Sequence, residues 1–149
     1  MPAPSVQLEV LSPSNYKDSL FTKDEIAQFL FVSLERFGDP LEDIHKCLDY
    51  AFSDKPGFGG VCLVAYRKKE ILGVVVVNET NFKGYIPENI LVYIAVKAST
   101  RGQGIGKYLL TETKKQVKGA LALHVEPDNP ARFLYQSVGF SNKYLEMRW

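Results

Sequence analysis

The sequence predicts an α/β domain in which about four helices flank a mixed, mostly antiparallel central sheet, with residues 1–149 forming one domain. Three observations support this prediction. Apolar residues follow helical spacing in some segments and alternating spacing in others. These segments succeed one another as strand, two helices, three strands, helix, strand, helix and strand. A length of 149 residues, with 46% hydrophobic and 23% charged side chains, suits one core and not two.

The N-terminal third of the chain is predicted to hold one strand and two helices. Residues 6–12 alternate weakly and predict the strand. Thr22 is expected to cap the first helix and to form a capping box with Glu25, and Gly38 ends the helical pattern. The second helix is expected to use Asp39 as its N-cap, with a proline directly after it.

The rest of the chain is predicted to complete the sheet and to add two helices. The two central strands are expected to form a hairpin around Lys68 and Lys69. The predicted elements are strands at 60–68, 70–80 and 89–96, a helix at 104–118, a strand at 120–127, a helix at 129–138 and a last strand at 143–149.

Charge and composition argue against several classes of protein. The net charge of +1, from 18 basic and 17 acidic side chains, provides no basic field for a nucleic-acid partner. The sequence has neither a leader pattern nor a long apolar run, so we expect no signal peptide, no membrane span and a cytoplasmic location. Cys47 and Cys62 are expected to be buried, reduced thiols. With only two histidines, no metal site is predicted.

The stretch STRGQGIGKYLL, residues 99–110, places three glycines and two cations between a predicted strand and a predicted helix. Glycine is unfavourable inside a helix, so this spacing indicates that something approaches the backbone closely. A junction of strand, glycine loop and helix presents free N–H groups to an anion. A P-loop fails, because Arg101 and Tyr108 replace its first glycine and its magnesium-binding hydroxyl. The G-x-G-x-x-G dinucleotide fingerprint fits poorly, because the spacing here is G-x-G-x-G.

Two motifs resemble those of one known family. Residues Arg101–Gly106, RGQGIG, resemble the R/Q-x-x-G-x-G/A pyrophosphate loop of the GNAT acetyltransferase superfamily. Residues Asn129–Phe140, NPARFLYQSVGF, look like the family's A-x-x-x-Y-x-x-x-G-F helix and strand start. The predicted element order is also the family's order, so the resemblance covers nearly the whole chain. It implies a GNAT-like fold and acetyl-coenzyme A (acetyl-CoA) as the acyl donor.

The resemblance also implies which residues hold the coenzyme phosphates. Backbone amides of the loop would hold the pyrophosphate, and Gly104 and Gly106 would allow its oxygens to approach. The side chains of Arg101 and Lys107 would add positive charge, and Arg132 is a candidate partner for the 3′-phosphate. The loop positions are Gly102, Gln103, Gly104, Ile105, Gly106 and Lys107.

The pantetheine arm is expected along the strand that precedes the glycine loop. Ile94, Ala95 and Val96 would pair their backbone with its amides, as an added strand pairs with a sheet edge. Relatives usually place an asparagine seven residues before the motif tyrosine, where this chain has Asp128 and then Asn129. Either Asn129 still meets the pantetheine or that contact is lost.

Acetyl transfer to an amine needs a neutral amine, a stabilised oxyanion and a proton for the leaving thiolate. The resemblance implies Tyr135 as the general acid, the alternative being an aromatic ring packed on the sheet. The backbone N–H of Val96 would meet the oxyanion. Many relatives carry a glutamate base three residues before this valine, where Tyr93 stands here. The base is therefore open among His124 in the next strand, Glu79, and water alone.

These residues favour an acetyl-CoA-dependent N-acetyltransferase that transfers an acetyl group directly to a primary amine of a small molecule or a peptide N-terminus. The alternative is a non-catalytic acyl-CoA-binding sensor or assembly module of the same fold. Tyr135 favours the enzyme, and Tyr93 in place of the glutamate favours the module. The acceptor is not readable from the sequence. Because the chain ends soon after Phe140, the acceptor cleft is expected to be open or to be completed by a second subunit of a homodimer.

Overall fold

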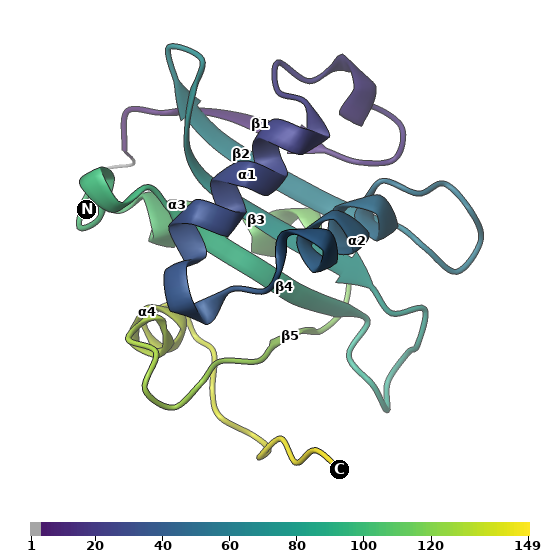
Figure 1. Cartoon of the computed structure of the whole chain (residues 1–149). Helices are drawn as coiled ribbons and strands as arrows, with labels where there is room; N and C mark the ends of the chain where they lie inside the picture. Colours follow the sequence, from purple (N-terminus) through teal and green to yellow (C-terminus); the bar gives the residue numbers. More distant parts are fainter. Residues whose placement is uncertain (1–3) are drawn as a thin grey trace.

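The computed structural model describes residues 4–149 and confirms a mixed α/β fold on one five-stranded sheet (Figure 1). The strands lie side by side in chain order. Neighbouring strands are antiparallel, except that β4 and β5 are parallel. The strands are β1 (Gln7–Leu11), β2 (Gly60–Arg67), β3 (Glu70–Glu79), β4 (Asn89–Val96) and β5 (Leu121–Leu123).

The four predicted helices form, and helices cover both faces of the sheet. Two of them, α1 and α2, pack on one face, and α3 packs on the other, against β2, β3 and β4 (Figure 1). The helices are α1 (Lys23–Leu34), α2 (Leu41–Ala51), α3 (Ile105–Gln116) and α4 (Ala131–Ser137). Within residues 4–149, no helix is long and apolar enough to cross a membrane.

Two apolar clusters lie on opposite sides of the sheet. Alternate residues of β3 divide between them, because successive side chains of a strand point to opposite faces. Val74 and Val76 face α1 and α2, whereas Val75 and Val77 face α3, and all four are fully buried. The central strand is therefore apolar on both faces, as expected for a sheet that helices cover on both sides.

The two cysteines are free and buried, as predicted, and both belong to the cluster beneath α1 and α2. Burial raises the pKa of the Cys47 thiol to about 12, and burial also raises the pKa of the Cys62 thiol. Both thiols are therefore protonated at neutral pH and pack as small apolar groups.

The start of α1 matches the sequence prediction, and the start of α2 does not. The Glu25 N–H donates to Thr22 Oγ1 and the Thr22 N–H donates to Glu25 Oε1, both at 3.1 Å, which confirms the capping box. Pro40 precedes α2, and no side chain caps this helix. The carboxylate of Asp39, the expected cap, instead accepts a hydrogen bond of 2.5 Å from the Tyr93 hydroxyl of β4. Asp39 therefore bonds a residue that is distant in sequence, Tyr93, instead of the backbone at the start of α2.

The hairpin between β2 and β3 turns at Lys68 and Lys69, as predicted. Their φ angles are +51° and +64°. Two successive residues in this left-handed region make the turn whose twist matches that of two antiparallel strands. The turn lies at the same end of the sheet as the end of β4, since Gly73 of β3 pairs with Val96.

Two predicted strands near the C-terminus need correction. The strand expected at 120–127 forms only at Leu121–Leu123, and the strand expected at 143–149 does not form. A strand needs a neighbour to pair its backbone, and the three residues of β5 offer little edge to a following segment. The apolar residues behind the second prediction are exposed instead; they are Tyr144, Leu145, Met147 and Trp149.

A bulge in β4 decides which of its side chains face which cluster. The pairing of β4 with β3 shifts by one residue at Val92. Beyond this bulge, Tyr93 and Ala95 face α1 and α2, whereas Ile94 and Val96 face α3. The bulge therefore aims Tyr93 toward the linker between α1 and α2.

The packing of α3 on the sheet depends on Gly73 of β3, and substitution there should destabilise the fold. A Cβ atom at this position would lie 2.7 Å from Leu109 Cδ1 and 3.1 Å from Ile105 Cγ2. We expect Gly73→Ala to lower the free energy of unfolding by about 1–3 kcal/mol through overpacking, as measured by urea denaturation. Val32→Ala, at an exposed position of α1, is the control and should change it by less than about 0.5 kcal/mol. Unchanged stability of Gly73→Ala would mean that α3 can move away from the sheet without cost.

Candidate active site

The candidate active site surrounds the place where β4 and β5 part, here called the β4–β5 split. β5 pairs only with the beginning of β4, and its last pair joins Leu123 to Leu91. Beyond that pair, the chain leaves the sheet and continues toward α4 (Figure 1). Among residues 4–149, no strand lies beside the remainder of β4 on this side.

The strand register shows which backbone groups face the split. The Lys97 N–H donates to the Leu72 carbonyl at 2.8 Å, so Val96 belongs to the next pair, which is not hydrogen-bonded. By the same alternation, Ile94 is in a non-hydrogen-bonded pair and Ala95 is in a hydrogen-bonded one. The N–H and C=O groups of Ile94 and Val96 therefore point away from β3 toward the split. Those of Ala95 point toward β3.

The glycine loop follows β4 after a 3-10 helical turn at Ala98–Thr100, and it leads into the N-terminus of α3 (Figure 1). Gly102 and Gly104 have φ angles of +81° and +84°, which lie in the left-handed region that favours glycine. Gly104 is the N-cap of α3, which begins at Ile105, and the exposed Gln103 lies between the two glycines. The first N–H groups of α3 have no partner within the helix, and the helix dipole makes this end positive. The geometry suits a bound anion.

Gly106 has a packing role in addition to the phosphate-binding role that is predicted for it. It is buried in the first turn of α3, and a Cβ atom there would lie 2.9 Å from Leu134 Cδ2 and 3.7 Å from Val96 Cγ2. The missing side chain therefore lets α4 and the end of β4 pack against the start of α3. The sequence pattern could not separate this packing role from close approach of a phosphate, because both require glycine.

The three cations predicted to bind the coenzyme differ in the contacts that they make within the protein. Arg101 Nη2 donates to the Ser33 carbonyl at 3.0 Å, and Nη1 lies 3.5 Å from Glu35 Oε1. Arg101 therefore ties the loop to the C-terminal end of α1. Lys107, in the first turn of α3, is exposed and is in no ion pair among the described residues. Arg132 is on α4, with its guanidinium 5.0 Å from the centre of the Phe133 ring.

Tyr135 lies on α4 in the apolar cluster of the α3 face, where Ile94 and Val96 also pack. Its ring meets Phe140 edge-on at 6.0 Å between centroids. No hydrogen bond within residues 4–149 involves its hydroxyl. Among these residues, Asn78 Oδ1 is the only side-chain polar atom that is both inaccessible to solvent and without a hydrogen-bond partner. The Tyr135 hydroxyl therefore reaches solvent. Burial of the ring raises its pKa to about 12, so it is protonated at neutral pH.

The two candidate bases lie far apart. His124 follows β5 directly, with its side chain 70% exposed and its Nδ1 atom 2.9 Å from Glu146 Oε2 in the C-terminal segment. Glu79 ends β3 and pairs with Asn89 at the start of β4, at the opposite end of that strand from Val96. This register separates Glu79 from the glycine loop by most of the length of β4, at about 3.3 Å per residue.

The Asn129 side chain is hydrogen-bonded to the backbone at the start of α4. Its Oδ1 atom accepts a hydrogen bond of 2.9 Å from the Ala131 N–H at the start of the helix. The neighbouring Asp128 forms an ion pair with Arg36 at 3.2 Å, which links the loop before α4 to the linker between α1 and α2. Both side chains at the position where relatives carry asparagine therefore have partners within the protein.

The sequence did not predict a contact between Asp39 and Tyr93. It showed only that Tyr93 stands where many relatives carry a glutamate. Tyr93 is 7% exposed, and its hydroxyl donates to Asp39 Oδ2. Burial, followed by the hydrogen bond to Asp39, raises the pKa of Tyr93 far above its usual value. The phenol is therefore neutral and donates the shared proton, whereas Asp39 accepts it. Nothing in the local sequence connects positions 39 and 93.

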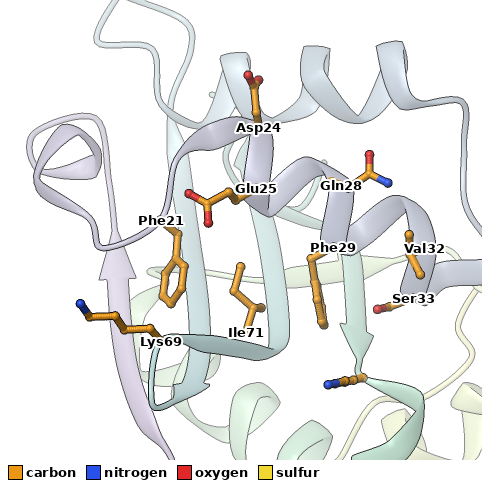
Figure 2. A pocket seen from close by; sticks show the side chains of 10 residues that line it. Phe21, Asp24, Glu25, Gln28, Phe29, Val32, Ser33, Lys69 and Ile71 are labelled. Atoms are coloured by element: carbon orange, nitrogen blue, oxygen red, sulfur yellow. The ribbon is translucent and has the colours of Figure 1, made fainter.

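A groove of about 680 Å³ lies between α1 and the β2–β3 turn (Figure 2). Figure 2 shows Phe21, Phe29 and Ile71 between the helix and the strands beneath it. The lining residues are Phe21, Asp24, Glu25, Gln28, Phe29, Val32, Ser33, Lys69, Ile71 and Lys97. None of the residues predicted to bind the coenzyme or to act in catalysis lines this groove. Among the described residues, no cluster of three His, Cys, Asp or Glu side chains could hold a metal ion.

Comparison with known proteins identifies the family. A model of the acetyltransferase (GNAT) domain matches residues 58–142, which is more than half of the chain. The chain therefore belongs to the GNAT acetyltransferase family, as its two motifs predicted. No curated protein sequence matches it.

Solved structures share this fold. Aminoglycoside N-acetyltransferase AAC(6')-Iy, solved in complex with CoA, matches with a TM-score of 0.68 and 14% identity over 100% of this chain and 97% of that chain. A transcriptional regulator from Bacillus halodurans C-125 matches with a TM-score of 0.66 and 20% identity, over 97% of this chain and 99% of that chain. A ribosomal-protein-alanine N-acetyltransferase from Brucella melitensis biovar Abortus 2308 matches with a TM-score of 0.60 and 15% identity, over 97% of this chain and 98% of that chain. At such low identity, these matches show a common fold.

Proposed function

We propose that this protein is an acetyl-CoA-dependent N-acetyltransferase that transfers an acetyl group directly to a primary amine of a small molecule or a peptide N-terminus. The observation that carries the proposal is the junction of β4, glycine loop and α3. It combines free strand amides at Ile94 and Val96 with a helix N-terminus that opens on a left-handed Gly104. An extended, amide-containing arm that ends in a pyrophosphate fits both features.

The residues present fit the coenzyme. Backbone N–H groups between Gly102 and Lys107 would hold the pyrophosphate, and the free ammonium of Lys107 would add charge. Arg101 would act indirectly, because its guanidinium fixes the loop against α1. Arg132, exposed on α4, would meet the 3′-phosphate. The Asn129 side chain already accepts a hydrogen bond from the Ala131 N–H, so the pantetheine would rely on the strand amides of Ile94 and Val96 instead.

Acetyl-CoA supplies an acetyl thioester, whose C–S bond breaks as the amine nitrogen forms the new C–N bond. The Tyr135 hydroxyl would give its proton to the departing sulfur and regain one from water. His124 would accept the proton lost by the amine and pass it to solvent, with Glu146 orienting its ring. The Val96 N–H would stabilise the oxyanion. Glu79 has no part in this proposal, since it lies at the other end of β4.

The alternative is a non-catalytic acyl-CoA-binding module of the same fold. It is favoured by one observation, the replacement of the usual glutamate by Tyr93, whose hydroxyl is committed to Asp39. Such a module would bind acetyl-CoA and would transfer nothing to any amine. A binding measurement combined with a turnover measurement separates the two functions.

The first experiment is thermal unfolding with and without excess acetyl-CoA, with ATP and NAD as controls. A ligand at 100 times its dissociation constant stabilises the folded state by about 2.7 kcal/mol. For a domain of this size, we expect the melting temperature to rise by about 5–10 °C with acetyl-CoA alone. No rise, or a rise with ATP instead, contradicts the coenzyme assignment.

Gly104→Glu should abolish this acetyl-CoA-dependent rise, because a carboxylate would stand at the helix terminus that is to receive the pyrophosphate. The matched control is Gly57→Glu in the loop before β2, where φ is +87° and open space surrounds the missing side chain. Both substitutions place a side chain at a glycine of nearly the same positive φ, so the melting temperatures of the two variants without ligand are compared first. An intact acetyl-CoA response in Gly104→Glu would contradict the assignment of the loop.

Tyr135→Phe should lower kcat by about 100-fold or more and leave the acetyl-CoA thermal shift unchanged. An acid acts in its protonated form, and burial raises the pKa of Tyr135 to about 12. Ionisation of Tyr135 should therefore cause no loss of kcat between pH 7 and about pH 10. Tyr85→Phe, at an exposed position, is the control. Equal losses of turnover and coenzyme affinity in Tyr135→Phe would identify Tyr135 as a packing residue.

A further inference from the structure

A carboxylate and a phenol from distant parts of the chain meet beside the β4–β5 split, on the face covered by α1 and α2. Asp39 lies in the linker between these helices, and its Oδ2 atom is 2.5 Å from the Tyr93 hydroxyl. The bulge at Val92 aims Tyr93 to this face, and the body of its ring is buried. A buried neutral phenol thus fixes the direction of an exposed carboxylate.

The charge of Asp39 is not neutralised by any ion pair among residues 4–149. Three other acidic groups of this region have cationic partners, whereas the exposed Glu126, like Asp39, is in no ion pair among these residues. Asp43 pairs with Lys46 at 3.4 Å, Asp128 pairs with Arg36 at 3.2 Å, and Glu146 pairs with Arg148. Asp39 also caps no helix, since α2 has no side-chain cap. Its one partner is a hydroxyl, so a full negative charge is held in place beside the split.

Other polar groups lie near this pair. His124 directly follows β5, its side chain is exposed, and its Nδ1 atom lies 2.9 Å from Glu146 Oε2 in the C-terminal segment. The chain's own Arg148 also comes near. Its pKa is raised, first by the hydrogen bond to Glu146, and the charge of Asp39 contributes in the same direction. Arg148 forms its ion pair with Glu146 and not with Asp39.

We propose that Asp39, aimed by Tyr93, binds an ammonium group of the acceptor that does not react, so that the acceptors are diamines or polyamines. This inference rests on the proposed N-acetyltransferase function and names the substrate class of the same site. Tyr93 is a positioning residue, and Asp39 is the residue that contacts the substrate.

The bound ammonium has to be a second nitrogen of the acceptor. A carboxylate stabilises the protonated form of an amine beside it, and a protonated nitrogen has no lone pair with which to attack a thioester. If Asp39 held the reacting nitrogen, it would oppose the reaction. A nitrogen that stays protonated at Asp39 orients the molecule, while the other nitrogen loses its proton and reacts.

Three acceptors of similar length test the inference. We would measure kcat and KM at saturating acetyl-CoA for 1,4-diaminobutane, butylamine and 4-aminobutanoate, which differ only in the group remote from one primary amine. The wild-type protein should favour the diamine over butylamine by about five- to tenfold in kcat/KM, mainly through KM. The amino acid should be the poorest acceptor, because its carboxylate is repelled by Asp39.

The variants assign this preference to the pair. Asp39→Asn should raise KM for the diamine by about five- to tenfold, keep kcat, and leave the values for butylamine unchanged. Tyr93→Phe should change KM in the same direction by a smaller factor, because the carboxylate remains but is no longer held. Arg148→Ala should lower KM for the diamine by removing a competing cation. Asp54→Asn, an exposed aspartate in the loop after α2 with no ion pair among residues 4–149, removes the same charge as a control.

The acetyl-CoA thermal shift is recorded for every variant, so that two kinds of failure can be told apart. A shift that is retained in Asp39→Asn, together with loss of the diamine preference, supports the inference. Equal kcat/KM values for diamine and butylamine, or an unchanged preference in Asp39→Asn, overturn it. Binding of acetyl-CoA without turnover of any of the three amines overturns it as well. Absence of any acetyl-CoA shift in the wild type contradicts the proposed function; calorimetric titration with 1,4-diaminobutane then decides the inference, and binding that does not depend on Asp39 overturns it.

Discussion

The structure around the candidate site depends on one requirement, that backbone N–H and C=O groups be paired. One edge of β4 is satisfied by β3 along its length, and the other is covered by β5 only as far as Leu91. Ile94 and Val96 are left with groups that point into the β4–β5 split. In the proposed function, an extended ligand with its own amides would complete this edge as a further strand would. The bulge at Val92 lies where the two edges begin to differ, and it decides which side chains accompany these free groups.

The position of the glycine loop depends on the packing of α3 and α4 close to the end of β4. Gly73 lets α3 lie against β3, and Gly106 lets Leu134 of α4 and Val96 of β4 approach the first turn of α3. Arg101 then fixes the loop to the end of α1. The side chains of Ile94, Val96, Ile105 and Tyr135 belong to one apolar cluster, so that the proposed binding and chemistry would share one support.

The two sides of the split differ in polarity. In the proposed function, each side therefore has its own role. The α3 side is apolar, and it buries the ring of Tyr135 so that the phenol stays protonated. The α1–α2 side carries the fixed carboxylate of Asp39, and His124 is exposed where the chain leaves β5. A protonated acid on one side, and groups that accept protons or bind cations on the other, match the needs of the departing thiolate and of the incoming amine.

The sequence by itself determined the layered fold, the capping box of α1, the turn at Lys68 and Lys69, and the glycine-rich junction before α3. Each of these depends on neighbours in the chain, through periodicity, capping or positive φ. Only the tertiary structure decided that β5 stops at Leu123, that 143–149 forms no strand, that Gly106 serves packing, and that Asp39 leaves its helix for Tyr93. These features are fixed by contacts between residues far apart in sequence, and a local pattern carries no information about which distant partner wins.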